Sequence, residues 1–273
     1  MARPSPLTAC FIVLALLGAS CREMPADAVS PREFAPSPTS PRAFLEIGSG
    51  EAPHVLQQGS RTQMPAPTSL DRWSWVLRAT GDRLSVFGAP RSGAALQANV
   101  DAENPWDQPI AFPVRSVHLE DGAAWYRVMI GIEPNGSNGW VRGSDVTFER
   151  IRHRVVIDLS TRTLRHYRND ELSHRFDVGI GALETPTTVG TFFVWARLKP
   201  RDPSGPYGSY LLGLSGFSEV LTNWPGGGRI AIHGTADPAD PGNRVSYGCA
   251  RVFNPQMNRL RGIPMGTIVL IRH

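Results

Sequence analysis

The chain has 273 residues, with 28 Lys and Arg against 24 Asp and Glu, which gives a formal net charge of +4. Its 27 Gly and 24 Pro leave few uninterrupted periodic runs, and this excludes a coiled coil or a long helical bundle. The one long apolar run is too short to span a bilayer comfortably, which excludes a polytopic membrane protein, and the length predicts one or two domains.

Residues 1–25 have the layout of a secretory signal peptide. Arg3 supplies a positive charge, residues 10–17 are apolar, and small residues end the segment at Cys21. Two processing routes are open. The small residues before Cys21 resemble a bacterial lipobox, in which case Cys21 carries a lipid anchor, and cleavage after Ala26-Asp27-Ala28 is the alternative. Either route predicts export to the bacterial cell envelope, in the periplasm or the cell wall.

Residues 26–68 are predicted to form a spacer rich in Pro and Ser. Prolines recur in it among Ser, Thr and Ala, with little hydrophobic periodicity. Such a stretch buries too little apolar surface to offset its chain entropy, so we expect it to be extended and semi-rigid. A tether followed by a spacer suits a protein that reaches a target away from its anchor.

Residues 69–149 alternate short apolar runs with turns and are predicted to form a small β domain. Strands are expected over residues 75–79, 84–87, 125–130 and 139–141, with a turn over residues 134–139. Gly139-Trp140-Val141 resembles the phrase that closes bacterial SH3-like domains. That resemblance implies a small SH3-like barrel that binds a partner or the envelope. The alternative for Trp125 and Trp140 is that both are core aromatics.

Residues 150–273 are predicted to form a second β-dominant domain, large enough for its own core. Strands are expected over residues 154–159, 163–168, 175–180, 192–195, 229–233 and 267–271, loops over 203–207 and 225–228, and a short helix over 254–261. Asn169-Asp170 predicts a tight hairpin turn. The histidines of that hairpin, His166 and His174, are expected to be solvated.

The cysteines give the sharpest functional signal. Cys10 lies in the predicted signal and Cys21 is lipidated or removed, so the mature folded part keeps only Cys249. A single thiol forms no internal disulfide, and a lone thiol in an exported protein is a candidate nucleophile. Its neighbour Gly248 allows a tight turn that brings backbone N–H groups close to a reacting carbonyl. The alternative for Cys249 is a small buried apolar side chain.

His233 follows a predicted buried strand and is the candidate base, although a structural histidine is the alternative. A thiol within hydrogen-bond reach of an imidazole forms a thiolate–imidazolium pair, so we expect a lowered pKa for Cys249. No metal site or cofactor is expected, because one Cys and one His supply too few ligands. Nucleic-acid binding is not expected either, because no dense basic run with interleaved aromatics occurs.

These residues resemble the signature of the L,D-transpeptidase catalytic (YkuD-type) domain family. The chain reads His233-Gly234-Thr235, and twelve residues separate His233 from Ser246-Tyr247-Gly248-Cys249-Ala250-Arg251. Residues 184–192 look like the family's T-P-x-G-x-F/Y stretch, slightly lengthened, and residues 212–218 and 226–233 look like its approach to the histidine. Tyr247 is a departure, because many members have histidine there, and it puts substrate preference or pocket shape in doubt.

The resemblance implies a peptidoglycan L,D-transpeptidase. Cys249 would attack the carbonyl of the third residue of a stem peptide, release D-Ala and leave a thioester. An amine from another stem peptide or from an acceptor protein would then take the acyl group. His233 would move the protons, with its tautomer fixed by a backbone carbonyl, for which Gly234 is the candidate.

The resemblance also implies roles around the nucleophile. Backbone N–H groups of Gly248 and Cys249 would form the oxyanion hole, and Ser246 would hold the loop. Arg251, Tyr247 and Thr235 are predicted to contact substrate. For Arg251, a salt bridge that braces the loop is the alternative.

The sequence leaves three other functions open. The same site could pass the acyl group to water as an L,D-carboxypeptidase, or Tyr247 could mark a decayed site in an inactive wall-binding protein. A sortase also uses His, Cys and Arg, but the close spacing of His233 and Cys249 fits it poorly. In each case a mildly basic surface would favour an anionic cell wall.

Overall fold

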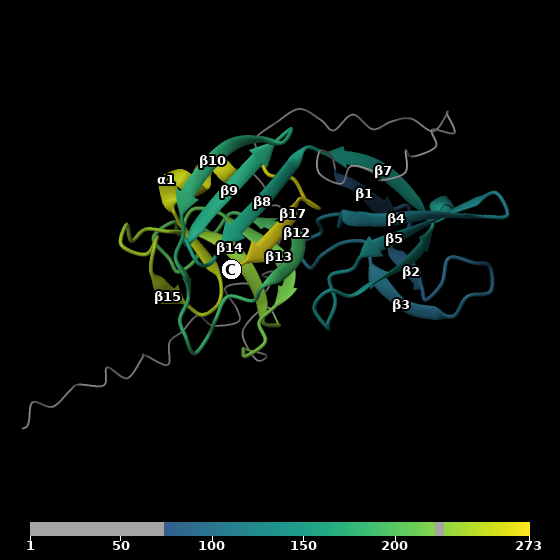
Figure 1. The fold of residues 1–273 in the computed structure, drawn as a ribbon, viewed down its shortest axis with the longest axis horizontal. Coiled ribbons are helices and arrows are strands. Elements are labelled where there is room, and N and C mark those ends of the chain that lie inside the picture. The colour runs from purple at the N-terminus through teal and green to yellow at the C-terminus, as the bar shows by residue number, and fades with distance from the viewer. Residues whose placement is uncertain (1–73, 222–226) are drawn as a thin grey trace, which may run out of the picture. The chain divides into compact units, whose positions relative to one another are not determined.

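The computed structural model describes residues 74–221 and 227–273, which form a mainly β structure (Figure 1). The predicted signal (1–25), with Cys10 and Cys21, and the predicted spacer (26–68) lie outside the described residues. Within the described ranges, no helix is both long enough and apolar enough to cross a membrane.

The first part of the described chain forms a seven-stranded antiparallel sheet, in the order β3-β2-β6-β5-β4-β1-β7. Its strands are β1 (Ser74–Ala79), β2 (Arg83–Phe87), β3 (Leu96–Asp101), β4 (Phe112–Glu120), β5 (Ala123–Met129), β6 (Asn138–Arg142) and β7 (Val146–Ile151). The four strands predicted here are confirmed to within two residues. Strands β3, β4 and β7 were not predicted, because polar and charged residues interrupt each of them and leave no apolar run longer than three residues.

Aromatic side chains pack within this first sheet. Trp125 is buried and meets the Phe87 ring edge-on at 5.5 Å, and the Arg142 guanidinium lies 4.6 Å from the centre of the Phe87 ring. Trp140 is half-buried, with His118 edge-on at 6.1 Å. Trp125 is therefore a core aromatic, as its alternative interpretation proposed, and the SH3-like identity of the sheet stays a prediction.

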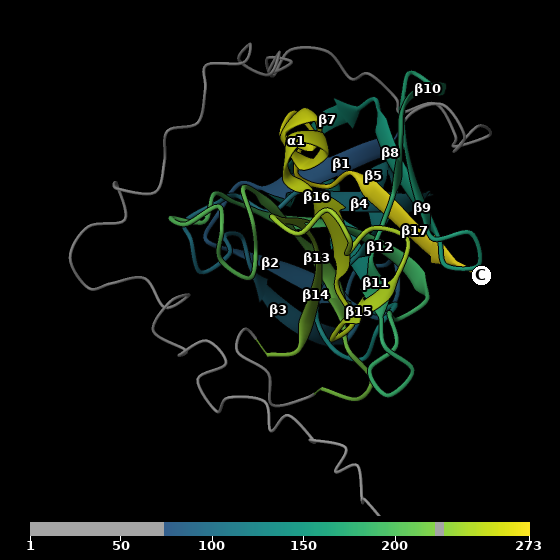
Figure 2. The same ribbon diagram turned by 90° about the vertical axis from the view of Figure 1, so that its left-hand side faces the viewer.

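The second part forms an eight-stranded mixed sheet, in the order β10-β9-β8-β17-β12-β13-β14-β16, and a two-stranded sheet of β11 and β15 (Figure 2). Its strands are β8 (His153–Asp158), β9 (Thr163–Arg168), β10 (Glu171–Asp177), β11 (Ile180–Gly181), β12 (Gly190–Leu198), β13 (Leu211–Phe217), β14 (Arg229–Thr235), β15 (Arg244–Ser246), β16 (Ala250–Phe253) and β17 (Ile268–Arg272). The predicted helix is present as α1 (Asn254–Met257) with the 3-10 turn η4 (Asn258–Leu260) beside β14 and β16.

The hairpin turn predicted at Asn169-Asp170 is confirmed and joins β9 to β10. Asn169 and Asp170 have φ angles of 52° and 68°, which is the pair of positive values that a two-residue hairpin turn requires. Strand β10 begins at Glu171, four residues earlier than predicted, because it continues to pair with β9 through a bulge between Leu172 and His174. Strand β13 was not predicted, because Gly213 and Gly216 interrupt its apolar pattern.

Strand β12 is buried on both faces. Successive side chains of a strand point to opposite sides, so each face of β12 packs into a different core. Phe192 and Val194 pack into the core of the second sheet, whereas Phe193 and Trp195 are buried with residues of the first sheet. The Gln108 side chain extends this contact. Its amide accepts from the N–H of Arg197 at 3.0 Å and donates to the carbonyl of Arg197 at 2.6 Å. The two sheets therefore share a core along β12.

Candidate active site

His233 and Cys249 lie on neighbouring segments of the second sheet. His233 is in β14, and Cys249 immediately precedes β16. These strands run parallel, with Ile232 opposite Ala250 and His233 opposite Arg251. Paired residues of a parallel sheet share a face and side chains alternate along each strand, so this register directs Cys249 and His233 to the same face. The backbone of Ala231, two residues before His233, hydrogen-bonds the Cys249 thiol.

The orientation of His233 is set by its own strand. Its Nδ1 lies 2.8 Å from the carbonyl oxygen of Gly234. A carbonyl only accepts, so Nδ1 carries the hydrogen and Nε2 is left as the basic nitrogen. The ring of Tyr207 meets the imidazole edge-on, with 5.2 Å between ring centres. Sequence reasoning missed Tyr207, because it lies in a loop with no motif to mark it.

Burial controls the protonation of both groups. It raises the pKa of the Cys249 thiol, against smaller opposing effects of the Ala231 backbone and Arg251. It also lowers the pKa of His233 to about 4, although the hydrogen bond to Gly234 acts in the opposite direction. Both shifts favour the uncharged forms. The prediction of a lowered pKa for the Cys249 thiol is therefore wrong, because the loss of solvation outweighs the nearby charges.

Ser246 holds the turn that carries the thiol. Its buried hydroxyl donates to the carbonyl of Cys249 at 2.6 Å and accepts from the N–H of Gly248 at 3.2 Å. Gly248 has a φ angle of 113°, a conformation that favours glycine. Because Ser246 already engages the N–H of Gly248, the N–H of Cys249 is the better of the two predicted oxyanion donors.

Asp240, which no sequence motif indicated, binds Thr235 and Arg251, two of the residues predicted to contact substrate. Its Oδ2 accepts from the Thr235 hydroxyl at 2.7 Å and from Arg251 Nη1 at 3.2 Å, and the residue is only 8% exposed. This is the loop-bracing salt bridge named above as the alternative for Arg251. Within the described residues, Nε of Arg251 is buried without a hydrogen-bond partner. Substrate contact by Arg251 and Thr235 stays a prediction.

Gly234 and Tyr247 differ in their surroundings. The N–H of Gly234 donates to the carbonyl of Tyr210 at 2.9 Å, and a Cβ at Gly234 would overlap the side-chain oxygen of Asn254. A Cβ there would also lie 2.7 Å from the nitrogen of Ser209, so Gly234 lets the loop before β13 pack against β14. Tyr247 is 36% exposed, and substrate contact by this side chain stays a prediction.

Three further histidines form a chain across β8, β9 and β10. His153 Nδ1 lies 2.9 Å from His166 Nε2, and His166 Nδ1 lies 3.2 Å from His174 Nδ1. His166 is 4% exposed, so the prediction that it is solvated is wrong. The nitrogens face one another in pairs instead of converging on one point. Across residues 74–221 and 227–273, no three or more His, Cys, Asp or Glu side chains are grouped to hold a metal ion.

Known proteins resemble the part of the chain that contains the second sheet. The family described as L,D-transpeptidase catalytic domain (YkuD) matches residues 152–271. A Bacillus licheniformis protein, provisionally named L,D-transpeptidase YkuD, is 36% identical over 124 residues, which are 45% of this chain and 67% of that protein. The protein of the same provisional name from Bacillus subtilis is 32% identical over 122 residues, 44% of this chain and 66% of that protein.

A solved structure, the Ldtfm–avibactam carbamoyl enzyme, is 23% identical with a TM-score of 0.36, over 45% of this chain and 49% of that chain. The match thus spans about half the length of that protein. The assignment depends on the domain match, which covers the segments that carry His233 and Cys249, and on the Bacillus relatives. Through residues 152–271, the chain belongs to the YkuD family of L,D-transpeptidase catalytic domains.

Proposed function

We propose that this chain is a peptidoglycan L,D-transpeptidase that transfers the acyl group of a stem tetrapeptide to an amine through a thioester on Cys249. The observation that carries the proposal is the β14–β16 register, which directs Cys249 to the face of the buried base His233. Membership of the YkuD family supports the reaction class and a peptidoglycan substrate.

The neutral state of the pair shapes the first half-reaction. As Sγ of Cys249 bonds to the carbonyl carbon of the third stem residue, Nε2 of His233 takes the thiol proton. The carbonyl electrons move to oxygen, and the N–H of Cys249 donates to this oxyanion. Collapse of the intermediate breaks the C–N bond, and the imidazolium returns its proton to the departing D-Ala. A thioester remains on Cys249.

The second half-reaction repeats these roles. The acceptor amine attacks the thioester carbon, and His233 takes a proton from the amine. Collapse breaks the C–S bond, the new amide is released, and the imidazolium reprotonates the sulfur of Cys249. Water in place of the amine would give carboxypeptidase activity, so exclusion of water from the acyl-enzyme decides between the two outcomes.

Mass spectrometry with a tetrapeptide-containing muropeptide tests the proposal on the chain from residue 26 onward. We expect D-Ala release, a transient adduct on Cys249 and a cross-linked dimer. Cys249→Ala should stay folded and form no adduct, and an adduct on that variant would refute the proposal. D-Ala release without dimers, even when an amine acceptor is added, would identify a carboxypeptidase. Pelleting with sacculi without acylation would identify an inactive wall-binding protein.

We also infer export to the bacterial envelope, because the proposed substrate is located there. A lipid anchor at Cys21 followed by the Pro-rich spacer would let the catalytic sheet reach the wall from a membrane. The test is incorporation of radioactive palmitate into the parent chain and into the Cys21→Ala variant, both expressed in bacteria. Label that is lost in the variant supports the anchor, and an unlabelled parent chain that is cleaved near Ala28 supports simple secretion.

A further inference from the structure

The carbonyl of Ser246 is held by two donors from a separate turn. The N–H of Ala182 donates to it at 2.9 Å, and the hydroxyl of Thr185 donates to it at 3.1 Å. Thr185 lies 61 residues before Ser246 in the sequence, in the segment between β11 and β12. The donors thus come from outside the loop that carries the nucleophile.

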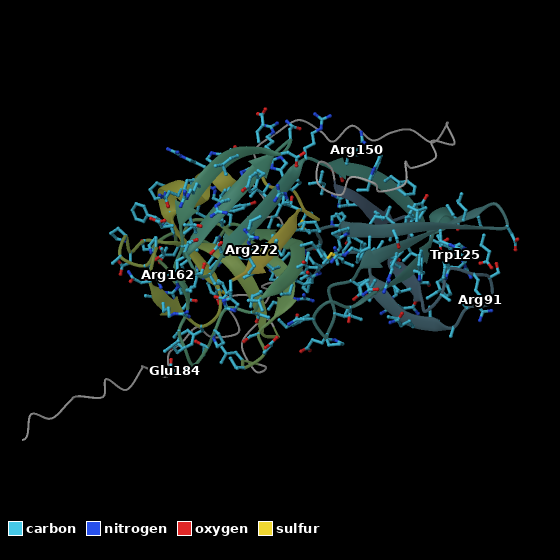
Figure 3. The ribbon with its side chains drawn as sticks, viewed as in Figure 1. Arg91, Trp125, Arg150, Arg162, Glu184 and Arg272 are labelled. Atoms are coloured by element: carbon cyan, nitrogen blue, oxygen red, sulfur yellow. The ribbon has the colours of Figure 1, made fainter. Side chains whose placement is uncertain are left out.

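The turn that supplies these donors is itself anchored. The N–H of Thr185 donates to the carbonyl of Ala182 at 3.3 Å, and the N–H of Gly181 donates to Thr187 Oγ1 at 2.9 Å. A Cβ at Gly181 would lie 2.6 Å from the nitrogen of Thr187, so only glycine allows this close approach. Glu184, labelled in Figure 3, is an exposed residue of this turn. Strand β11 pairs with β15 and brings Gly181 opposite Ser246.

A continuous series of hydrogen bonds runs from this turn to the nucleophile. Thr185 holds the carbonyl of Ser246, and the hydroxyl of Ser246 holds both the carbonyl of Cys249 and the N–H of Gly248. The held groups belong to the Tyr247–Gly248 and Cys249–Ala250 peptide units, which flank the Gly248–Cys249 peptide. They therefore restrict the direction of the Cys249 N–H, which becomes important only when negative charge develops on the substrate oxygen.

We propose that Thr185 is a positioning residue that orders the Ser246–Cys249 turn, so that the N–H of Cys249 is aimed at the oxyanion of the acyl-transfer reaction. The inference deepens the proposed function and depends on it. The Thr185 hydroxyl donates to the carbonyl of Ser246. Its effect passes through Ser246, as preorganisation of a catalytic donor by a supporting hydrogen bond requires.

Thr185→Val removes the hydroxyl and keeps the shape of the side chain, and Thr185→Ser restores the hydroxyl. We expect Thr185→Val to lower the maximal rate of acylation by a carbapenem about three- to tenfold, with its half-saturation concentration changed less than about twofold. Thr185→Ser should recover most of the rate. Alkylation of Cys249 by iodoacetamide develops no oxyanion, so Thr185→Val should leave that rate within about twofold.

Thr80 provides a matched control in the first sheet. Its hydroxyl donates to the carbonyl of Asp145 at 3.1 Å, and that carbonyl also accepts from the N–H of Thr80 at 3.0 Å. Thr80→Val therefore removes the same kind of bond far along the chain from the nucleophile. We expect it to leave acylation unchanged, with thermal unfolding of both valine variants recorded to compare their folding.

Amide hydrogen exchange separates this inference from the proposed function. We expect Thr185→Val to speed exchange at Gly248 and Cys249 at least about threefold, whether or not the chain acylates. Unchanged exchange would overturn the inference, as would equal acylation by Thr185→Val and the parent, or an equal fall in acylation and alkylation. Faster exchange in a chain that no carbapenem or tetrapeptide acylates would uphold the ordering of the turn and refute the proposed function instead.

Discussion

Burial of His233 determines the pH range in which its imidazole is neutral. An exposed imidazole has a pKa near 6.5, whereas the pKa of His233 is lowered to about 4 because burial disfavours the imidazolium. The imidazole is thus already neutral under conditions in which an exposed histidine is mostly charged. The raised pKa of Cys249 favours the protonated thiol.

This protonation state gives a pH dependence for acylation. Because only neutral His233 accepts the thiol proton, we expect the second-order rate constant to hold down to about pH 5 and to fall as the pH approaches about 4. The measurement is carbapenem acylation across this range, with circular dichroism at each pH to check folding. A fall centred near pH 6.5 instead would mean that His233 titrates like a solvated residue.

The ion pair between Asp240 and Arg251 is expected to stabilise the fold. Asp240→Asn removes the charge that faces Arg251, whose side chain is 24% exposed, so we expect the free energy of unfolding to fall by about 2 kcal/mol. The control is Asp101→Asn, because the Arg83–Asp101 pair is 62% and 73% exposed and should contribute under about 1 kcal/mol. Equal urea midpoints for Asp240→Asn and the parent chain would contradict the stabilising role.

At the scale of elements, the histidine chain joins β8, β9 and β10. The centres of His153 and His166 are 5.1 Å apart while their facing nitrogens are 2.9 Å apart, and the rings are inclined by only 17°. The rings therefore meet edge to edge, as in-line hydrogen bonds require. Burial lowers the pKa of His153 and of His166 to about 4, with Arg168 acting in the same direction on both.

The lowered pKa values of His153 and His166 make the stability of the fold depend on pH. Between about pH 6.5 and 4 the unfolded chain binds protons that the folded chain excludes, so the free energy of unfolding falls as the pH falls through this window. We expect replacement of His153, His166 and His174 by Gln to flatten this slope. The measurement is the melting temperature of the parent and the variant across this pH range. An unchanged pH dependence would show that the three histidines take up protons freely in the folded protein.

Elements with strong local signals were predictable from the sequence, and those defined by distant partners were not. The Asn169-Asp170 turn specifies its own geometry, so the β9–β10 hairpin was expected before the sheet was known. Strand β16 has only four residues and is defined by parallel pairing with β14. No periodic pattern in so short a segment reveals this partner.

At the scale of the whole molecule, the shared core along β12 couples the two sheets. Phe193 and Trp195 belong to the second sheet but are buried with Leu77 and Phe112 of the first sheet. A catalytic region without the first sheet would expose these rings to water. The shared core therefore extends beyond residues 152–271, which the family match covers.

Truncation tests this coupling. We expect residues 150–273 alone to melt at a lower temperature than residues 69–273, or to aggregate, because large aromatic side chains lose their cover. Differential scanning calorimetry compares the two chains. Matching melting temperatures and full solubility of the shorter chain would show that the catalytic sheet folds independently.

The sequence by itself determined the family, the mainly β fold and the two candidate catalytic residues, because His233-Gly234-Thr235 and Ser246–Cys249 are short local patterns. Only the tertiary structure decided the pKa values of those residues and the side chains that support them. The pKa values of His233 and Cys249 depend on burial, and Asp240 and Thr185 reach the site through contacts that no local pattern encodes. Solvation and hydrogen-bond partners are set by which distant segments pack together, and that is known only once the chain has folded.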